Sequence, residues 1–224
     1  MPADQAAGLR NRQRRADPRA ITLIDTPADI ALRLAQALIA SGQKVLLIDS
    51  PGRHTATHNT HFLFGWQQQL AQQGLQTWPV AGVDVLHAPG AMAGDPAIMQ
   101  ASAHYHAVIF DGYKLQSEMA FAMHRQQLVI ALAQADTLER AYALIKTLHQ
   151  RQLTWRVKLI GEMVLAGPLI AAVAHFLPAQ SGRLEHMNLD DDAHFRALAA
   201  RISAADGDTP PFNNDTEEDF AQHG

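Results

Sequence analysis

Short apolar segments alternate with longer amphipathic segments along most of this chain. The apolar segments are rich in β-branched residues and apolar on both faces, which is typical of strands buried in a parallel sheet. The pattern predicts strands at residues 20–25, 44–49, 83–87, 107–111, 127–133 and 156–161. Helical periodicity in the intervals predicts helices near residues 27–41, 61–73, 95–104, 115–125, 136–151, 167–177 and 191–203.

This alternation predicts an α/β fold with three layers, a mostly parallel sheet with helices on both faces. We expect one α/β domain over residues 20–204, preceded by a flexible basic arm at residues 1–19. A disordered acidic tail is expected over residues 205–224, where two consecutive prolines separate it from the body.

Composition limits the classes of chemistry and the compartment. The 224 residues are 47% hydrophobic, which is enough for one domain with a sizeable core. The chain has no cysteine, which excludes disulfides and thiolate chemistry and suits a reducing compartment. The sequence has neither an apolar run of membrane-spanning length nor the apolar core of a signal peptide, so we expect a cytoplasmic protein.

The two ends of the chain carry opposite charge. Residues 1–19 hold five arginines against Asp4 and Asp17, whereas residues 185–224 hold ten acidic residues against two arginines. A basic segment can contact nucleic acid, an anionic membrane or an acidic protein surface, and the alternative is a solvated arm without a partner. The acidic end argues against a nucleic-acid surface there.

The most informative position is the junction between the first predicted strand and the first predicted helix. Phosphate-binding loops use several glycines and a lysine, but the pattern G-x-x-x-x-G-K-[ST] does not occur here. Instead we expect Thr26 to cap the helix, Pro27 to be its first residue and Asp29 to complete a capping box. Asp25 and Asp29 would then place negative charge where a phosphate should lie. By itself, this junction also fits a capped turn in an unrelated α/β protein.

Several segments resemble the MinD/ParA family of nucleotide-binding proteins. KVLLID at residues 44–49 is similar to a strand of that family, and AVIFDG at 107–112 resembles the strand that ends in the family's magnesium-associated aspartate. RAYALIKTL at residues 140–148 resembles a helix of the FlhG (YlxH) regulators of flagellar number. DQAAGLR at residues 4–10 matches the D-Q-A-x-x-L-R motif that precedes the ATPase core of FlhG proteins.

The chain departs from the family where nucleotide would bind. The phosphate loop and both of its lysines have no counterpart, and Pro51 replaces a second acidic residue. Gly161 and Glu162 stand near the position of the family's adenine-contacting asparagine. The resemblance therefore implies a degenerate, non-catalytic pseudo-ATPase without a cofactor. Asp49 and Asp111 are expected to be vestigial residues that hydrogen-bond neighbouring loops.

The resemblance places the partner site in the arm. In FlhG proteins the matching motif binds the signal-recognition-type GTPase FlhF and stimulates its hydrolysis. The corresponding residues here are Asp4, Gln5, Ala6, Leu9 and Arg10. Gln5 and Leu9 would share one face of a helix, and Arg10 can make bidentate contacts to an acidic or phosphate group.

The resemblance further implies contact with flagellar switch or basal-body proteins and recruitment to the cell pole through partners. It implies no nucleic-acid partner and no direct membrane contact. Three alternatives remain open at this point. The arm motif can be inherited but idle, the chain can be an unconventional ATPase using Asp49 and Asp111, or it can be a plain interaction scaffold.

Two further patterns have plain structural interpretations. His54, His58 and His61 have a spacing that a helix would align as metal ligands, but the preceding Pro51-Gly52 indicates a loop, so no metal site is expected. The apolar stripe Phe195, Leu198 and Ile202 is expected to pack on the core, because the three aspartates before it would repel an anionic membrane.

Overall fold

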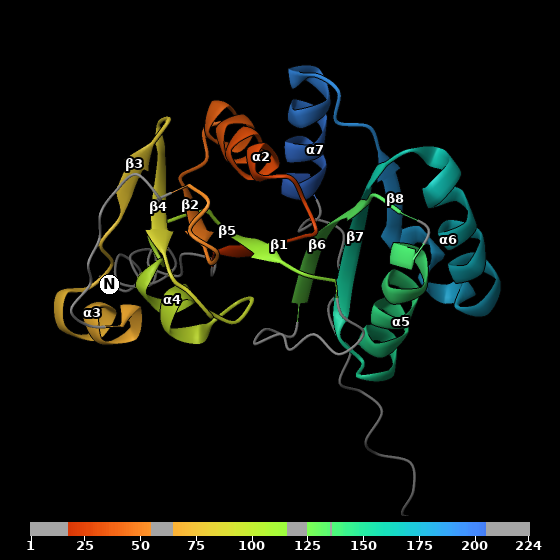
Figure 1. Ribbon diagram of the computed structural model, residues 1–224, viewed down its shortest axis with the longest axis horizontal. Helices are drawn as coiled ribbons and strands as arrows, with labels where there is room; N and C mark the ends of the chain where they lie inside the picture. The colour runs from red at the N-terminus through yellow and green to blue at the C-terminus, as the bar shows by residue number, and fades with distance from the viewer. Residues whose placement is uncertain (1–17, 55–64, 116–124, 135, 205–224) are drawn as a thin grey trace, which may run out of the picture.

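The computed structural model describes residues 18–54, 65–115, 125–134 and 136–204. Within these residues eight strands form one sheet in the order β3-β4-β2-β5-β1-β6-β7-β8 (Figure 1). Only β3 is antiparallel to its neighbour among these strands. The predicted α/β class, with a mostly parallel sheet, is confirmed. The strands are β1 (Arg19–Ile24), β2 (Val45–Asp49), β3 (Trp78–Val80), β4 (Val83–His87), β5 (Ala107–Tyr113), β6 (Arg125–Leu132), β7 (Thr154–Gly161) and β8 (Leu184–Met187).

The helices follow the predicted order. The helix expected near residues 115–125 falls mostly outside the described residues, and its last residue, Arg125, begins β6 instead. Among the described helices, none combines the length and apolar character needed to cross a membrane. The helices are α2 (Ala28–Ala40), α3 (Trp66–Gln73), α4 (Pro96–Ala101), α5 (Asp136–Gln150), α6 (Met163–Phe176) and α7 (Asp192–Ala204), with a 3₁₀ helix η1 (Pro178–Arg183).

The sheet separates two apolar layers. Helices α2 and α7 cover one face, where they bury Ile21, Leu23 and Leu47. Helices α3, α4, α5 and α6 cover the other face. The predicted stripe on α7 lies in the first layer, because Phe195, Leu198 and Ile202 are all buried there, so packing on the core is confirmed.

The first strand and the last helix meet at one end of the domain. Arg19 donates hydrogen bonds to the carbonyl oxygen of Ser203 (3.4 Å) and to Oε1 of Gln43 (3.5 Å). Gln43 also donates to the hydroxyl of Ser203. The two termini of the described domain are therefore neighbours in space.

An ion pair between a buried lysine and a partly exposed glutamate joins the last two strands of the sheet. Lys158 on β7 and Glu185 on β8 are register partners, and their Nζ and Oε2 atoms lie 2.7 Å apart. Only 4% of the Lys158 side chain is exposed. Arg201 on α7 donates to the same Oε2 atom at 2.8 Å. Burial alone would raise the pKa of Glu185, but hydrogen bonds from Lys158 and Arg201 hold it below its ordinary value.

Candidate functional site at the carboxyl edge of the sheet

Three aspartates mark the carboxyl ends of neighbouring strands. Because β1, β2 and β5 are parallel, Asp25, Asp49 and Asp111 lie along one edge of the sheet, where open α/β folds bind ligands. Asp49 and Asp111 are direct register partners, and neither has any exposed surface. Two buried carboxylates side by side require compensating donors or cations.

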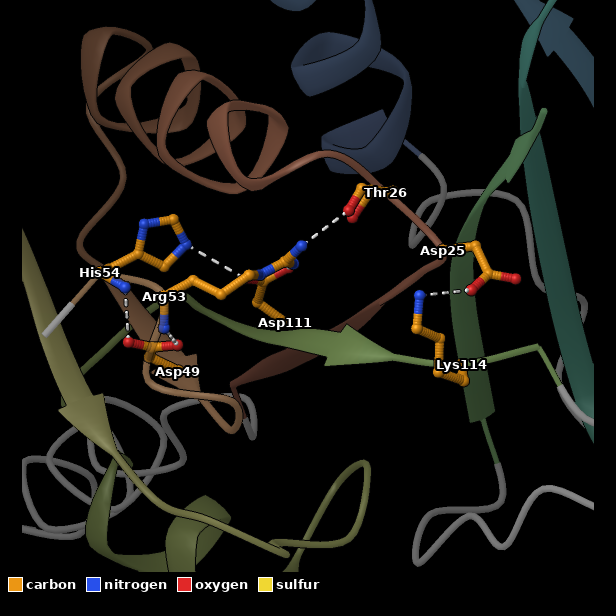
Figure 2. Close-up of polar contacts among 7 residues, drawn as sticks. All are labelled: Asp25, Thr26, Asp49, Arg53, His54, Asp111 and Lys114. Atoms are coloured by element: carbon orange, nitrogen blue, oxygen red, sulfur yellow. Dashed lines mark hydrogen bonds and ion pairs between the residues drawn. The ribbon is translucent and has the colours of Figure 1, made fainter. Parts of the chain in front are cut away.

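The β1–α2 junction is fixed by the end of β5. Asp25 has φ 53°, a left-handed conformation that turns the chain sharply after β1. Its backbone N–H donates to the carbonyl oxygen of Tyr113 at 2.9 Å. Its carboxylate accepts the backbone N–H of Leu115 at 3.3 Å. The same carboxylate pairs with Nζ of Lys114 at 3.4 Å (Figure 2). The backbone and the carboxylate of Asp25 therefore both stabilise this turn.

The predicted capping box at this junction is wrong. Helix α2 begins at Ala28, so Pro27 occupies the N-cap position and no side-chain capping hydrogen bond forms. Thr26 lies one residue too early to reach the helix N–H groups, and its hydroxyl is buried without a hydrogen-bond partner among the described residues. Asp29 is the second helical residue instead of the third, where it is exposed and favoured only by the helix dipole.

The loop after β2 folds back over the two buried aspartates (Figure 2). The backbone N–H groups of Arg53 and His54 donate to Oδ1 and Oδ2 of Asp49, each at 2.8 Å. The Arg53 guanidinium forms an ion pair with Oδ1 of Asp111, and Nε2 of His54 lies 3.0 Å from Oδ2 of Asp111. All four carboxylate oxygens are therefore engaged by two consecutive residues.

Arg53 also connects this loop to the β1–α2 junction. Its Nη1 atom donates to the carbonyl oxygen of Thr26 at 2.9 Å, while Nη2 contacts Asp111. The side chain is 29% exposed, so it reaches the buried aspartates from the solvent side. One guanidinium thus links the loop after β2 to β5 and to the start of α2.

Close packing of Pro51 against Gly112 holds the loop in this position. Gly112 directly follows Asp111 and has φ +89°. A Cβ atom placed there would lie 2.3 Å from Cδ and 2.4 Å from Cγ of Pro51, closer than real atoms approach. Glycine is therefore required both for the backbone conformation and for the space under the proline ring.

These residues do not fit the phosphates and magnesium of a bound nucleotide. Residues 24–30 contain neither glycine nor lysine, so this segment itself provides no glycine-rich loop of converging N–H groups and no lysine for a phosphate. Asp25 and Asp29 add negative charge there. Both aspartates that could hold a metal ion are engaged by Arg53 and His54.

A pocket of about 650 Å³ lies further along the same edge. Its apolar lining includes Ile30, Leu132 and Ile160, while Gly161 at the end of β7 and Glu162, the N-cap residue of α6, also line it. Lysine and arginine are absent from the described residues that line it. The pocket has the size of a small-molecule site, although its polar groups are mainly acidic.

The structure brings Asp49 and Asp111 together but tests only part of the predicted site. Asp4, Gln5, Ala6, Leu9 and Arg10 lie outside the described residues, as do His58 and His61. Sequence reasoning missed Arg53. It considered His54 only as a member of a helical histidine set, whereas His54 lies in a turn. The available signal was the Pro51-Gly52 pair, which begins two residues after Asp49 and is typical of a sharp turn.

His104 and His106, which precede β5, have structural contacts. Nδ1 of His106 accepts the backbone N–H of Lys44 at 2.7 Å, which ties the start of β5 to the start of β2. The His104 ring lies tilted against the ring of Tyr105, with ring centroids 4.3 Å apart. Neither contact points to a ligand.

Comparisons of the sequence with protein-family models and with curated proteins give no match. Comparison with solved structures does give similar folds. MinD cell division protein of Aquifex aeolicus has a TM-score of 0.55 at 12% identity, covering 86% of this chain and 98% of that one. The MinC:MinD cell division protein complex of the same organism gives 0.57 at 13% identity, with the same coverage.

A third structure is cobyrinic acid a,c-diamide synthase from Mycobacterium smegmatis with a bound ATP analogue and magnesium. It gives a TM-score of 0.51 at 14% identity and covers 85% of this chain and 96% of that one. At such low identity these similarities concern the fold, which they share with this chain over nearly the whole length of each structure. The chain therefore has the MinD-type α/β fold, with a β1–α2 junction that does not fit a nucleotide phosphate.

Proposed function

We propose that this chain is a non-catalytic regulator of flagellar biosynthesis, similar to FlhG proteins, that acts by binding other proteins. In this proposal the arm at residues 1–19 binds an FlhF-type GTPase and stimulates its hydrolysis. The observation that carries the non-catalytic part is the engagement of Asp49 and Asp111 by Arg53 and His54 beside a junction without a phosphate loop. Without a phosphate loop, we expect the chain to act through protein contacts instead of ATP hydrolysis.

Two further observations bear on the partner. One similar structure is a complex of MinD with MinC, which supports protein partners for this fold. The segment at residues 140–148 lies on α5, where Ala141, Leu144, Ile145 and Leu148 are buried. Its resemblance to FlhG proteins therefore reflects packing of α5 on the sheet. The partner assignment rests on the motif at residues 4–10.

The arm is tested by measuring GTP hydrolysis of an FlhF-type GTPase with added full-length chain. We expect stimulation by the wild type, and a return to the basal rate with Gln5→Ala/Arg10→Ala, because the motif's amide and guanidinium are then missing. Gln13→Ala/Arg14→Ala is the matched control, since it removes the same two residue types outside the motif. If both double variants stimulate hydrolysis as much as the wild type, the arm has no role. If both lose stimulation to the same extent, the arm acts only through its charge.

The pocket favours a second candidate, weak binding of a nucleotide through its base and ribose. Its volume and apolar lining suit such a group, whereas the β1–α2 junction offers nothing to the phosphates. Titration calorimetry with adenosine, ATP and Mg-ATP separates the two candidates. For the non-catalytic regulator we expect no tight binding of Mg-ATP and no gain from magnesium, because Arg53 pairs with Asp111.

Binding that Ala133→Trp abolishes would support the second candidate, because Ala133 lines the pocket. Tight binding that requires magnesium would overturn the non-catalytic assignment. The plain scaffold is distinguished by the arm variants above, since it predicts partner binding that neither double variant changes.

A further inference from the structure

The edge of the sheet where Asp49 and Asp111 lie under the loop after β2, called the crevice below, holds two carboxylates that need compensating cations or donors. Asp49 and Asp111 are adjacent across the sheet and completely buried. Buried carboxylates stay ionised only when cations and hydrogen-bond donors replace the lost water. Asp49 accepts two backbone N–H groups, whereas the contacts of Asp111 among the described residues come from the side chains of Arg53 and His54.

Arg53 contacts three of the segments that surround this crevice. Its guanidinium reaches Asp111 on β5 and the carbonyl oxygen of Thr26 before α2, while its backbone is bound to Asp49 at the end of β2 (Figure 2). A metal ion held by Asp49, His54 and Asp111 would also join the end of β2, the loop after it and β5 through its ligands. Arg53 joins the same three segments by charge and directed hydrogen bonds.

We propose that Arg53 is the built-in cation of this crevice and that it occupies a divalent-metal site formed by Asp49, His54 and Asp111. One ligand atom from each of these three residues lies within 4.8 Å of the others. Two carboxylates and one imidazole form a donor set that suits Zn²⁺ or Mn²⁺. The wild-type chain therefore needs no ion, whereas a chain without the guanidinium gains a site for one.

The exposed fractions of the side chains fit a solvent-facing cation, Arg53, above buried ligands. Asp111 has no exposed surface and the His54 side chain is 4% exposed, whereas Arg53 is 29% exposed. Replacement of Arg53 by a shorter neutral side chain therefore opens the crevice to solvent while leaving the three ligands in place. The inference concerns the crevice alone and does not depend on the partner proposed for the arm.

The test compares thermal unfolding of full-length wild type, Arg53→Gln and Arg53→Lys in EDTA and in excess ZnCl₂ or MnCl₂. We expect Arg53→Gln to melt below the wild type in EDTA and to gain about 5 °C or more with metal. Wild type and Arg53→Lys, which both keep a positive charge, should shift by less than about 2 °C. Arg140→Gln, which removes an exposed arginine paired with Asp136, should behave as the wild type.

Two controls identify the site. The chain has 12 histidines, so metal binding elsewhere is measured with Arg53→Gln/His54→Gln, which should lose the gain. The visible absorption of bound Co²⁺ reports metal binding without an unfolding measurement. It can therefore also be used if Arg53→Gln folds only in the presence of metal. The inference is overturned if metal stabilises wild type as much as Arg53→Gln, if Arg53→Gln gains nothing, or if the double variant retains the gain. All these variants keep the arm intact, so such a failure leaves the proposed GTPase stimulation standing.

Discussion

Replacing Gly112 by alanine is expected to destabilise the protein by about 3 kcal/mol or more. A left-handed φ costs a residue with Cβ about 1–2 kcal/mol, and overpacking adds about 1–3 kcal/mol. At Gly112 both apply, because φ is +89° and the new Cβ would meet the rigid ring of Pro51. For a domain of this size the melting temperature should fall by about 6–12 °C.

Gly82 provides the matched control for Gly112. It has a similar φ of +82°, but no atom lies within 4 Å of the position of its Cβ. Gly82→Ala should therefore show the backbone penalty alone, about 1 kcal/mol. Chemical unfolding of both variants measures the difference, and equal destabilisation would show that Pro51 moves without resistance.

The Gly112 variant also tests how the crevice is held together. The loop that carries Pro51 also carries Arg53 and His54. If the loop moves away to relieve the contact, both side chains retract from Asp111. We therefore expect Gly112→Ala to lack the metal-induced stabilisation expected for Arg53→Gln, because the ligand His54 is displaced together with Arg53.

Removing Glu185 is expected to cost about 3 kcal/mol, because it leaves the buried ammonium of Lys158 without its acidic partner. The expected order of stability is wild type, then Lys158→Met, then Glu185→Ala. Lys158→Met removes the buried charge itself and leaves Glu185 paired with Arg201, so its loss should be about 1 kcal/mol or less. Urea unfolding at neutral pH measures both, and a smaller loss for Glu185→Ala than for Lys158→Met would contradict the assignment.

The same ion pair gives a pH dependence with a definite sign. Glu185 has its pKa held below the ordinary value of 4.5 by Lys158 and Arg201, despite the opposing effect of burial. Its contribution to stability is therefore complete above that ordinary value and is lost as the pH falls through the lower pKa of the folded state. The stability difference between wild type and Glu185→Gln should be largest at neutral pH and shrink below about pH 4.5. A difference that stays constant down to pH 3 would contradict this.

The sequence predicted the elements that carry the core and missed those at the edges. Strands β1, β2, β4, β5, β6 and β7 are flanked on both sides in the sheet, so their residues form long apolar runs that periodicity detects. Strands β3 and β8 are the two edge strands among the described residues. They have three and four residues and include Pro79 and Glu185, so neither gives a clear strand pattern.

The carboxylates of the candidate site could be predicted from the sequence, whereas the side chains that contact them could not. Asp49 and Asp111 end apolar runs, and parallel strands bring such ends to one edge. That Arg53 reaches Asp111 depends on the path of a short loop, which is set by contacts such as Pro51 on Gly112. The predicted capping box was wrong by a single residue. Both Thr26 and Pro27 are acceptable beside the start of a helix, and the turn at Asp25 determines which of them is the N-cap.

The contact between Arg19 and Ser203 has a consequence for any measurement on the ends of the chain. Residues 1–17, with four arginines, and residues 205–224, with six carboxylates and no lysine or arginine, begin at adjacent points of the domain. The domain therefore carries a basic and an acidic segment at neighbouring attachment points. Because groups tethered at neighbouring points have effective concentrations in the millimolar range, we expect an affinity tag or truncation at one terminus to change the salt dependence measured for the other.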